Sequence, residues 1–146
     1  MKLLFTMILV AILVQGCGFK DTDDYSYQIS QYNIKIQSLG IKYNNDYSKE
    51  IGECKTRYVD KYDKESCVLA IKVRLVDIYS NILALHTLNS DVSNKGYKVR
   101  GGLEKRIMKC LQGFSLISSR GRCIRNLKSD IEHELLTLKS KKKDST

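Results

Sequence analysis

The sequence predicts an all-α protein, a small bundle of four to five helices in which two helical hairpins are each closed by a disulfide. The 146 residues include no proline and 9 glycines, which suits long helices and not a turn-rich sandwich or barrel. Apolar residues recur at alternating spacings of three and four along several segments, as on one face of a helix. An apolar content of 42% with 28% charged residues is typical of a folded globular chain.

The first helix is expected over residues 25–43 and the second over residues 48–59, with a break at 44–46 between them. The first carries an apolar stripe of Tyr25, Ile29, Tyr32, Ile36, Leu39 and Tyr43. Local alternation in this segment also suits a strand, and Gly40 weakens a helix, so a strand is the alternative. The second helix places Ile51, Cys54 and Tyr58 on one face.

The clearest element is a central, most buried helix over residues 66–88. Its apolar residues recur at alternating spacings of three and four residues: Val68, Ile71, Leu75, Ile78, Ile82 and Leu85. Residues 89–102 contain turn formers and end in Gly101-Gly102, which indicates an exposed loop. Further helices are expected over 103–117 and 123–138, separated by a turn at 118–121. The last helix turns Ile124, Leu127, Ile131, Leu135 and Leu138 inward.

Residues 1–16 have the parts of a secretory signal. Lys2 supplies the positive start, and residues 3–14 form an apolar run that is too short to span a bilayer comfortably. The segment Val14-Gln15-Gly16-Cys17 resembles the lipobox of bacterial lipoproteins, in which the cysteine is acylated and begins the mature chain. A plain signal peptide with an accidental cysteine, or an uncleaved anchor helix, is the alternative.

The resemblance to lipoproteins implies that acyl groups on Cys17 tether the chain to a membrane. Each buried methylene contributes about 0.8 kcal/mol, so two or three acyl chains give permanent attachment. In the sorting scheme of Gram-negative lipoproteins, Gly18 after the acylated cysteine favours the outer membrane. The expected organisation is a signal peptide (1–16), a tether (17–24), a helical domain (25–140) and a charged tail (141–146).

The other four cysteines fall into two equally spaced pairs, and an even number in an exported chain predicts two disulfides. Cys54 and Cys67 enclose twelve residues, as do Cys110 and Cys123, which is too many for a zinc knuckle. Thirteen helical steps rise about 20 Å, so a bond within a pair requires the chain to turn, near residues 62–64 and 118–121. The equal spacing favours these two local bonds, and cross-pairing between the hairpins is the alternative.

The formal charge of +9 is concentrated in the second half of the chain. Residues 17–90 hold ten basic and ten acidic residues, whereas residues 91–146 hold fourteen and six, a net charge of +8. We expect a basic face on the second hairpin, with these candidates for partner binding: Lys105, Arg106, Lys109, Arg120, Arg122 and Arg125. Such a face favours an acidic protein, anionic phospholipid or lipopolysaccharide, and export argues against nucleic acid. A solvated face without a specific partner is the alternative.

The sequence shows no motif for catalysis, for a cofactor or for a metal, and it predicts a protein that is not an enzyme. No nucleotide-binding loop or nucleophile elbow occurs, and His86 and His133 lack metal-ligand spacing. We expect His86 at a helix edge and His133 on the outer face of the last helix. Seven of the nine tyrosines lie between residues 25 and 62, where core packing or a recognition surface explains them.

Two short segments resemble the entry-exclusion lipoproteins of conjugative plasmids. Glu53-Cys54 and Glu65-Ser66-Cys67-Val68-Leu69-Ala70 match the two ends of a family motif in which twelve residues separate the cysteines. Residues 55–64 lack the Asn-Pro-Gly of that family, and the pair Cys110 and Cys123 lacks the flanking acid and alanine. The resemblance covers eighteen residues, 53–70.

These observations define three hypotheses, all of them binding functions. The first is a membrane-anchored exclusion protein that blocks a transfer apparatus or a phage receptor by direct contact. The second is a pilotin-like assembly factor that holds one helix or tail of a client in a groove. The third is a periplasmic immunity protein or inhibitor, and the basic hairpin argues against a cationic lysozyme as its target.

Overall fold

The computed structural model describes residues 22–41, 47–94 and 96–143. Within these ranges the regular elements are helices, which confirms the all-α class and the five-helix bundle. They are α2 (Thr22–Ser38), α3 (Ser48–Arg57), α4 (Lys61–Ser93), α5 (Leu103–Gln112) and α6 (Ile117–Lys143). The candidate lipobox with Cys17, the predicted break at 44–46 and the stripe residue Tyr43 lie outside the described ranges.

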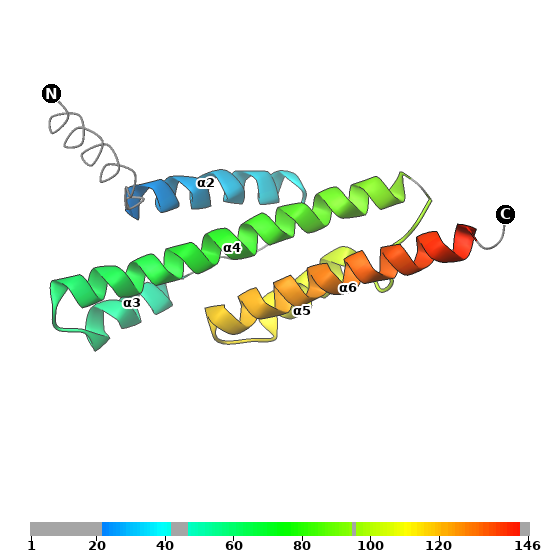
Figure 1. Ribbon diagram of the computed structural model, residues 1–146. Coiled ribbons are helices and arrows are strands. Elements are labelled where there is room, and N and C mark those ends of the chain that lie inside the picture. Colours follow the sequence, from blue (N-terminus) through cyan, green and yellow to red (C-terminus); the bar gives the residue numbers. More distant parts are fainter. Residues whose placement is uncertain (1–21, 42–46, 95, 144–146) are drawn as a thin grey trace, which may run out of the picture.

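Helix α4 is the centre of the bundle, as its apolar stripe predicts. Its 33 residues span about 50 Å at the usual helical rise. Helix α2 runs along one side of α4, and the hairpin of α5 and α6 runs along the other (Figure 1). Both α2 and α6 pack on α4 but not on each other, within the described part of the chain. The two sides of the bundle are therefore separate surfaces.

The core lies on both sides of α4. Five of the six predicted α4 stripe residues are buried, and Val68 is half-buried. They meet Ile36 from α2, Ile107 from α5, and Ile124 and Ile131 from α6, each of them at most 2% exposed. Tyr79, which falls outside the predicted stripe, is also fully buried.

Helix α4 is longer at both ends than the apolar pattern predicts. The Asp60 carboxylate accepts hydrogen bonds from the backbone N–H groups of Tyr62 (2.7 Å) and Asp63 (3.3 Å), which caps the helix at Lys61. The predicted turn at 62–64 is therefore wrong, and the chain reverses at residues 58–60 instead. At the other end α4 continues to Ser93, so the loop that was expected to begin at residue 89 is shorter.

The predicted turn at 118–121 is also wrong. Helix α5 ends at Gln112, the chain reverses over residues 113–116, and α6 begins at Ile117. The backbone N–H of Arg120 donates to the carbonyl of Leu116 at 3.1 Å, an ordinary bond of a first helical turn. Gly121 is a buried helical residue, and a Cβ built on it would lie 3.4 Å from Ile78. Gly121 therefore lies at the contact of α6 with α4 and not in a turn.

The ends of α2 and α6 differ from the predicted bounds by a few residues. Of the segment predicted as a helix over 25–43, residues 25–38 are helical and not a strand. Helix α2 ends at Ser38 because Gly40 adopts a left-handed φ of +75°. Helix α2 begins at Thr22 with two acidic residues in its first turn, so residues 22–24 of the predicted tether are helical. Helix α6 likewise continues through residues 141–143 of the predicted tail.

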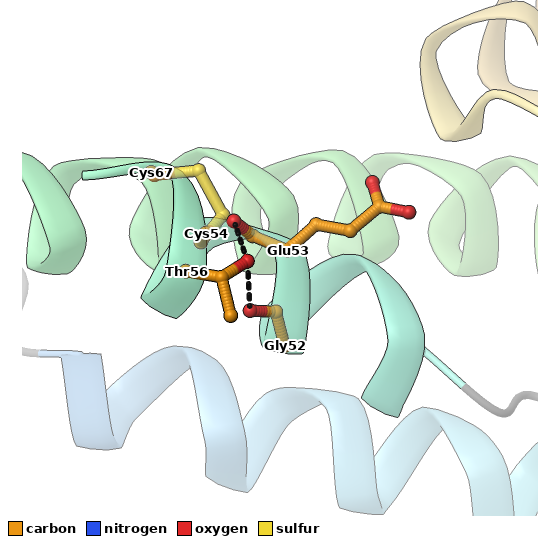
Figure 2. The surroundings of a disulfide bond; sticks show 5 residues. All are labelled: Gly52, Glu53, Cys54, Thr56 and Cys67. Atoms are coloured by element: carbon orange, nitrogen blue, oxygen red, sulfur yellow. Dashed lines mark hydrogen bonds between the residues drawn. A yellow bond between two sulfur atoms is a disulfide. The ribbon is translucent and has the colours of Figure 1, made fainter.

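The two predicted local disulfides are present and close two hairpins of similar design. The Cα atoms are 5.7 Å apart in Cys54–Cys67 and 5.4 Å apart in Cys110–Cys123. In each hairpin a helix of ten residues precedes a long helix, and the second cysteine is the seventh residue of the long helix. Figure 2 shows the first bond, with the Glu53 side chain extending away from the sulfur atoms.

Candidate functional site

A surface cavity of about 470 Å³ lies where the two hairpins meet. Its wall includes the Cys54–Cys67 disulfide and apolar side chains from both hairpin turns, Tyr58 and Leu116. Charged residues of both signs complete it: Glu50, Glu53, Arg57, Asp63 and Arg74. Apolar walls with a charged rim are also the composition of a surface that binds a protein.

Large apolar side chains are exposed at the ends of both hairpins. Val59 is 95% exposed, Tyr62 74% and Leu116 65%, and Tyr58 stands at 36%. We call Tyr58, Val59, Tyr62 and Leu116 the apolar tip. Two of the four, Tyr58 and Leu116, line the cavity. Exposed aromatic and aliphatic groups are typical of a recognition surface.

Arg120 holds the second hairpin turn in place. Its Nε donates to the carbonyl oxygen of Phe114 at 2.7 Å, and its Nη2 donates to that of Ser115 at 3.2 Å. Its Nη1 lies 3.8 Å from a carboxylate oxygen of Glu50 on α3. The turn that presents Leu116 is thus fixed to both α6 and α3, and the tip needs little ordering when it binds.

The structure divides the predicted basic face into two groups. Arg106 pairs with Glu134 at 2.8 Å and with Asp130 at 3.9 Å, Arg125 pairs with Asp77 on α4, and Arg120 pairs with Glu50. Each of these three arginines links two helices: Arg106 links α5 to α6, Arg120 links α6 to α3, and Arg125 links α6 to α4. The other three candidates, Lys105, Lys109 and Arg122, are exposed and take part in no ion pair with another described residue.

A second cavity of about 550 Å³ follows the groove between α5 and α6, and we call it the basic groove. Lys109 on α5 and Arg122 on α6 belong to its wall, with Arg106 and a single acidic residue, Asp130. Its apolar part is formed by Phe114, Leu127 and the Cys110–Cys123 disulfide. The groove therefore combines positive charge with an apolar surface.

Sequence reasoning missed Val59, Phe114 and Leu116 as surface residues. Phe114 falls within the helix predicted over 103–117, but it lies in the hairpin turn and is 43% exposed. A signal was available, because Gly113 follows α5 directly and marks its end. Apolar residues next to such an end fall outside the helical stripe and need not be buried.

The two histidines lie in different surroundings. His133 is exposed on α6, as predicted. His86 is half-buried on α4, and its Nε2 is buried without a hydrogen-bond partner among the described residues. Burial lowers the pKa of His86, and the nearby Glu104 carboxylate of α5 opposes that effect.

The described residues contain no group of three or more acidic, histidine or cysteine side chains placed to hold a metal ion. Within the same part of the chain, no helix has the length and apolar character needed to cross a membrane. Comparison with known protein families, with curated proteins and with solved structures finds no match.

Proposed function

We propose that this protein is a lipid-anchored protein of the bacterial envelope that acts by binding a protein partner, and that its role is entry or superinfection exclusion. The apolar tip is the observation that carries the proposal. Its exposed side chains stand on two hairpins, each closed by a disulfide, and Arg120 links the turn of the second hairpin to α3 of the first. A rigid apolar surface of this kind favours protein binding, because little conformational entropy is lost on contact.

The segment that resembles the entry-exclusion family coincides with this surface. Residues 53–70 form the end of α3, the turn at 58–60 and the start of α4. The matching residues Glu53, Cys54, Ser66, Cys67 and Ala70 line the cavity beside the tip. The resemblance and the exposed apolar side chains thus point to one surface, and this agreement supports exclusion over the other binding functions.

The proposed anchor is a set of acyl chains on Cys17, with the outer membrane favoured by Gly18. Since α2 begins at Thr22, four residues separate the acylated cysteine from the folded domain. Four residues reach at most about 14 Å when extended. The domain is therefore held close to the membrane surface.

The exclusion proposal is tested in recipient cells that express the protein. We expect wild-type protein to reduce conjugative transfer or phage adsorption, and Leu116→Glu to restore it by placing a charge in the apolar tip. Leu136→Glu is the matched control, because Leu116 and Leu136 are 65% and 64% exposed and both lie in the second hairpin. Transfer and adsorption equal to those of cells with an empty vector would contradict the proposal.

A pilotin-like assembly factor is the second candidate, and one observation favours it. A separate groove of about 410 Å³ between α4 and α6 is lined mainly by apolar residues, with two acidic residues at its wall: Leu88, Asp91, Val92, Tyr97, Glu132, Leu135 and Leu136. An apolar groove between helices suits one amphipathic helix of a client. In that case Leu136→Glu, and not Leu116→Glu, abolishes function and leaves a secretin mislocalised.

A further inference from the structure

We propose that the basic groove binds an acidic segment of the same protein partner whose apolar residues contact the tip. This inference rests on the proposed function and specifies the chemistry of the partner. The observed elements are two exposed cations in the groove wall, a third beside it, an aromatic side chain and a turn that connects the groove to the tip cavity.

The cations that can accept a partner are Lys105, Lys109 and Arg122. Lys109 on α5 and Arg122 on α6 line the groove, and Lys105 stands one helical turn before Lys109 and lines a neighbouring cavity. Arg106 also lines the groove, but the carboxylate of Glu134 at 2.8 Å satisfies its charge. An ion pair between Arg106 and a partner would have to displace Glu134, so the three exposed cations account for the attraction.

The second hairpin turn connects the groove with the apolar tip. Phe114 lines the basic groove and Leu116, two residues later, lines the cavity between the hairpins. Arg120 donates hydrogen bonds to the carbonyls of Phe114 and Ser115, so this short connection is rigid. One partner can therefore cover both surfaces if its acidic residues lie next to its apolar residues.

The placement of the groove favours an acidic protein segment over the membrane that holds the anchor. The hairpin of α5 and α6 lies on the side of α4 opposite α2 (Figure 1), and the proposed anchor at Cys17 precedes α2 in the sequence. The exposed cations are also distributed, since residues four apart on a helix rise about 6 Å. Distributed cations suit carboxylates spaced along a chain better than a single phosphate.

The test measures binding of a fluorescent glutamate-rich peptide to the full chain in nonionic detergent, by fluorescence anisotropy. We expect Lys109→Glu/Arg122→Glu to weaken binding by about tenfold or more, and added salt to weaken wild-type binding. Lys49→Glu/Lys55→Glu is the matched control, because it changes the net charge equally at two exposed lysines of α3. The control should bind the peptide with nearly wild-type affinity.

Two results would overturn the inference. One is equal affinity of both double variants, which would mean that net charge alone attracts the peptide. The other is binding of the groove to phosphatidylglycerol vesicles with no binding of the peptide, which would assign the groove to lipid.

The exclusion test in recipient cells, which measures conjugative transfer or phage adsorption, separates this inference from the proposed function. Loss of exclusion in Lys109→Glu/Arg122→Glu supports both. Exclusion by that double variant at the wild-type level overturns the inference and leaves the apolar tip as the binding surface. If the wild-type protein binds the peptide in the groove but causes no exclusion, the acidic partner is supported and the exclusion role is removed.

Discussion

Arg120 of α6 and Glu50 of α3 form an ion pair at 3.8 Å that joins the two disulfide-closed hairpins. Each side chain is 21% exposed, so water screens the pair less than it screens a surface pair. The same guanidinium donates two hydrogen bonds to the turn at 113–116. One side chain therefore sets the position of the turn and its contact with α3.

Replacement of Arg120 by glutamine is expected to lower the free energy of unfolding by about 2 kcal/mol, because hydrogen bonds from a charged donor are lost at a partly buried site. Urea unfolding followed by circular dichroism measures the change. Arg125→Gln is the comparison, since the Arg125–Asp77 pair is 53% and 39% exposed and should contribute about 1 kcal/mol or less. Equal losses in the two variants would contradict this role for Arg120.

The two disulfides are expected to contribute similarly to stability, because both close loops with a sequence separation of 13. Loops of this length typically contribute about 2–4 kcal/mol each. The double variants Cys54→Ala/Cys67→Ala and Cys110→Ala/Cys123→Ala should therefore lose comparable amounts in urea unfolding. Mass spectrometry after alkylation checks the bonds themselves, and alkylation of all four thiols before any reductant is added would refute them.

Protonation of His86 is expected to destabilise the fold. Burial lowers the pKa of His86 in the folded state, whereas the unfolded chain binds a proton near its usual value of about 6.5. The stabilisation from a neutral His86 is complete above about pH 6.5 and is lost as the pH falls toward the folded-state pKa. Urea unfolding at about pH 8 and about pH 5 should show this loss in wild-type protein and a smaller one in His86→Gln.

His133→Gln is the control for this measurement, because His133 is exposed on α6. It should keep the pH dependence of the wild-type protein. An equal pH dependence in His86→Gln would assign the effect to other groups.

Lipid attachment at Cys17 is expected to be necessary for membrane association. In cells grown with labelled palmitate, the wild-type chain should carry label and sediment with membranes, and Cys17→Ala should do neither. The acyl chains supply the affinity, since each buried methylene contributes about 0.8 kcal/mol. An unlabelled wild-type chain would remove the lipoprotein proposal.

The helical pattern was predictable from the sequence because burial on α4 follows a strict periodicity. Ile71, Leu75, Ile78, Ile82 and Leu85 face the core as their spacing requires. The local disulfides were likewise predictable from their equal spacing, once the chain is taken as exported. The turns were not, because Asp60 and Gly113 are weak local signals that compete with neighbouring residues of similar turn propensity.

For the candidate site too, the sequence predicted the residue types, but not the contacts that these residues make. The excess of basic residues after residue 90 was visible in the sequence, and six of them were candidates for binding. Only the tertiary structure places Glu50 of α3, Asp77 of α4 and Glu134 of α6 beside three of those six. Each of these acidic residues is at least 28 positions from its arginine, so no local pattern reveals the pair.

The sequence by itself determined the helical class, the central helix and the two covalently closed hairpins, because periodic burial and cysteine spacing act over short stretches of chain. The tertiary structure decided which cations stay exposed and which apolar side chains form the tip. The exposure of the cations depends on contacts between residues far apart in the chain, and the packing of α6 on α4 and α5 brings these residues together. The tip takes its side chains from the turns of two separate hairpins.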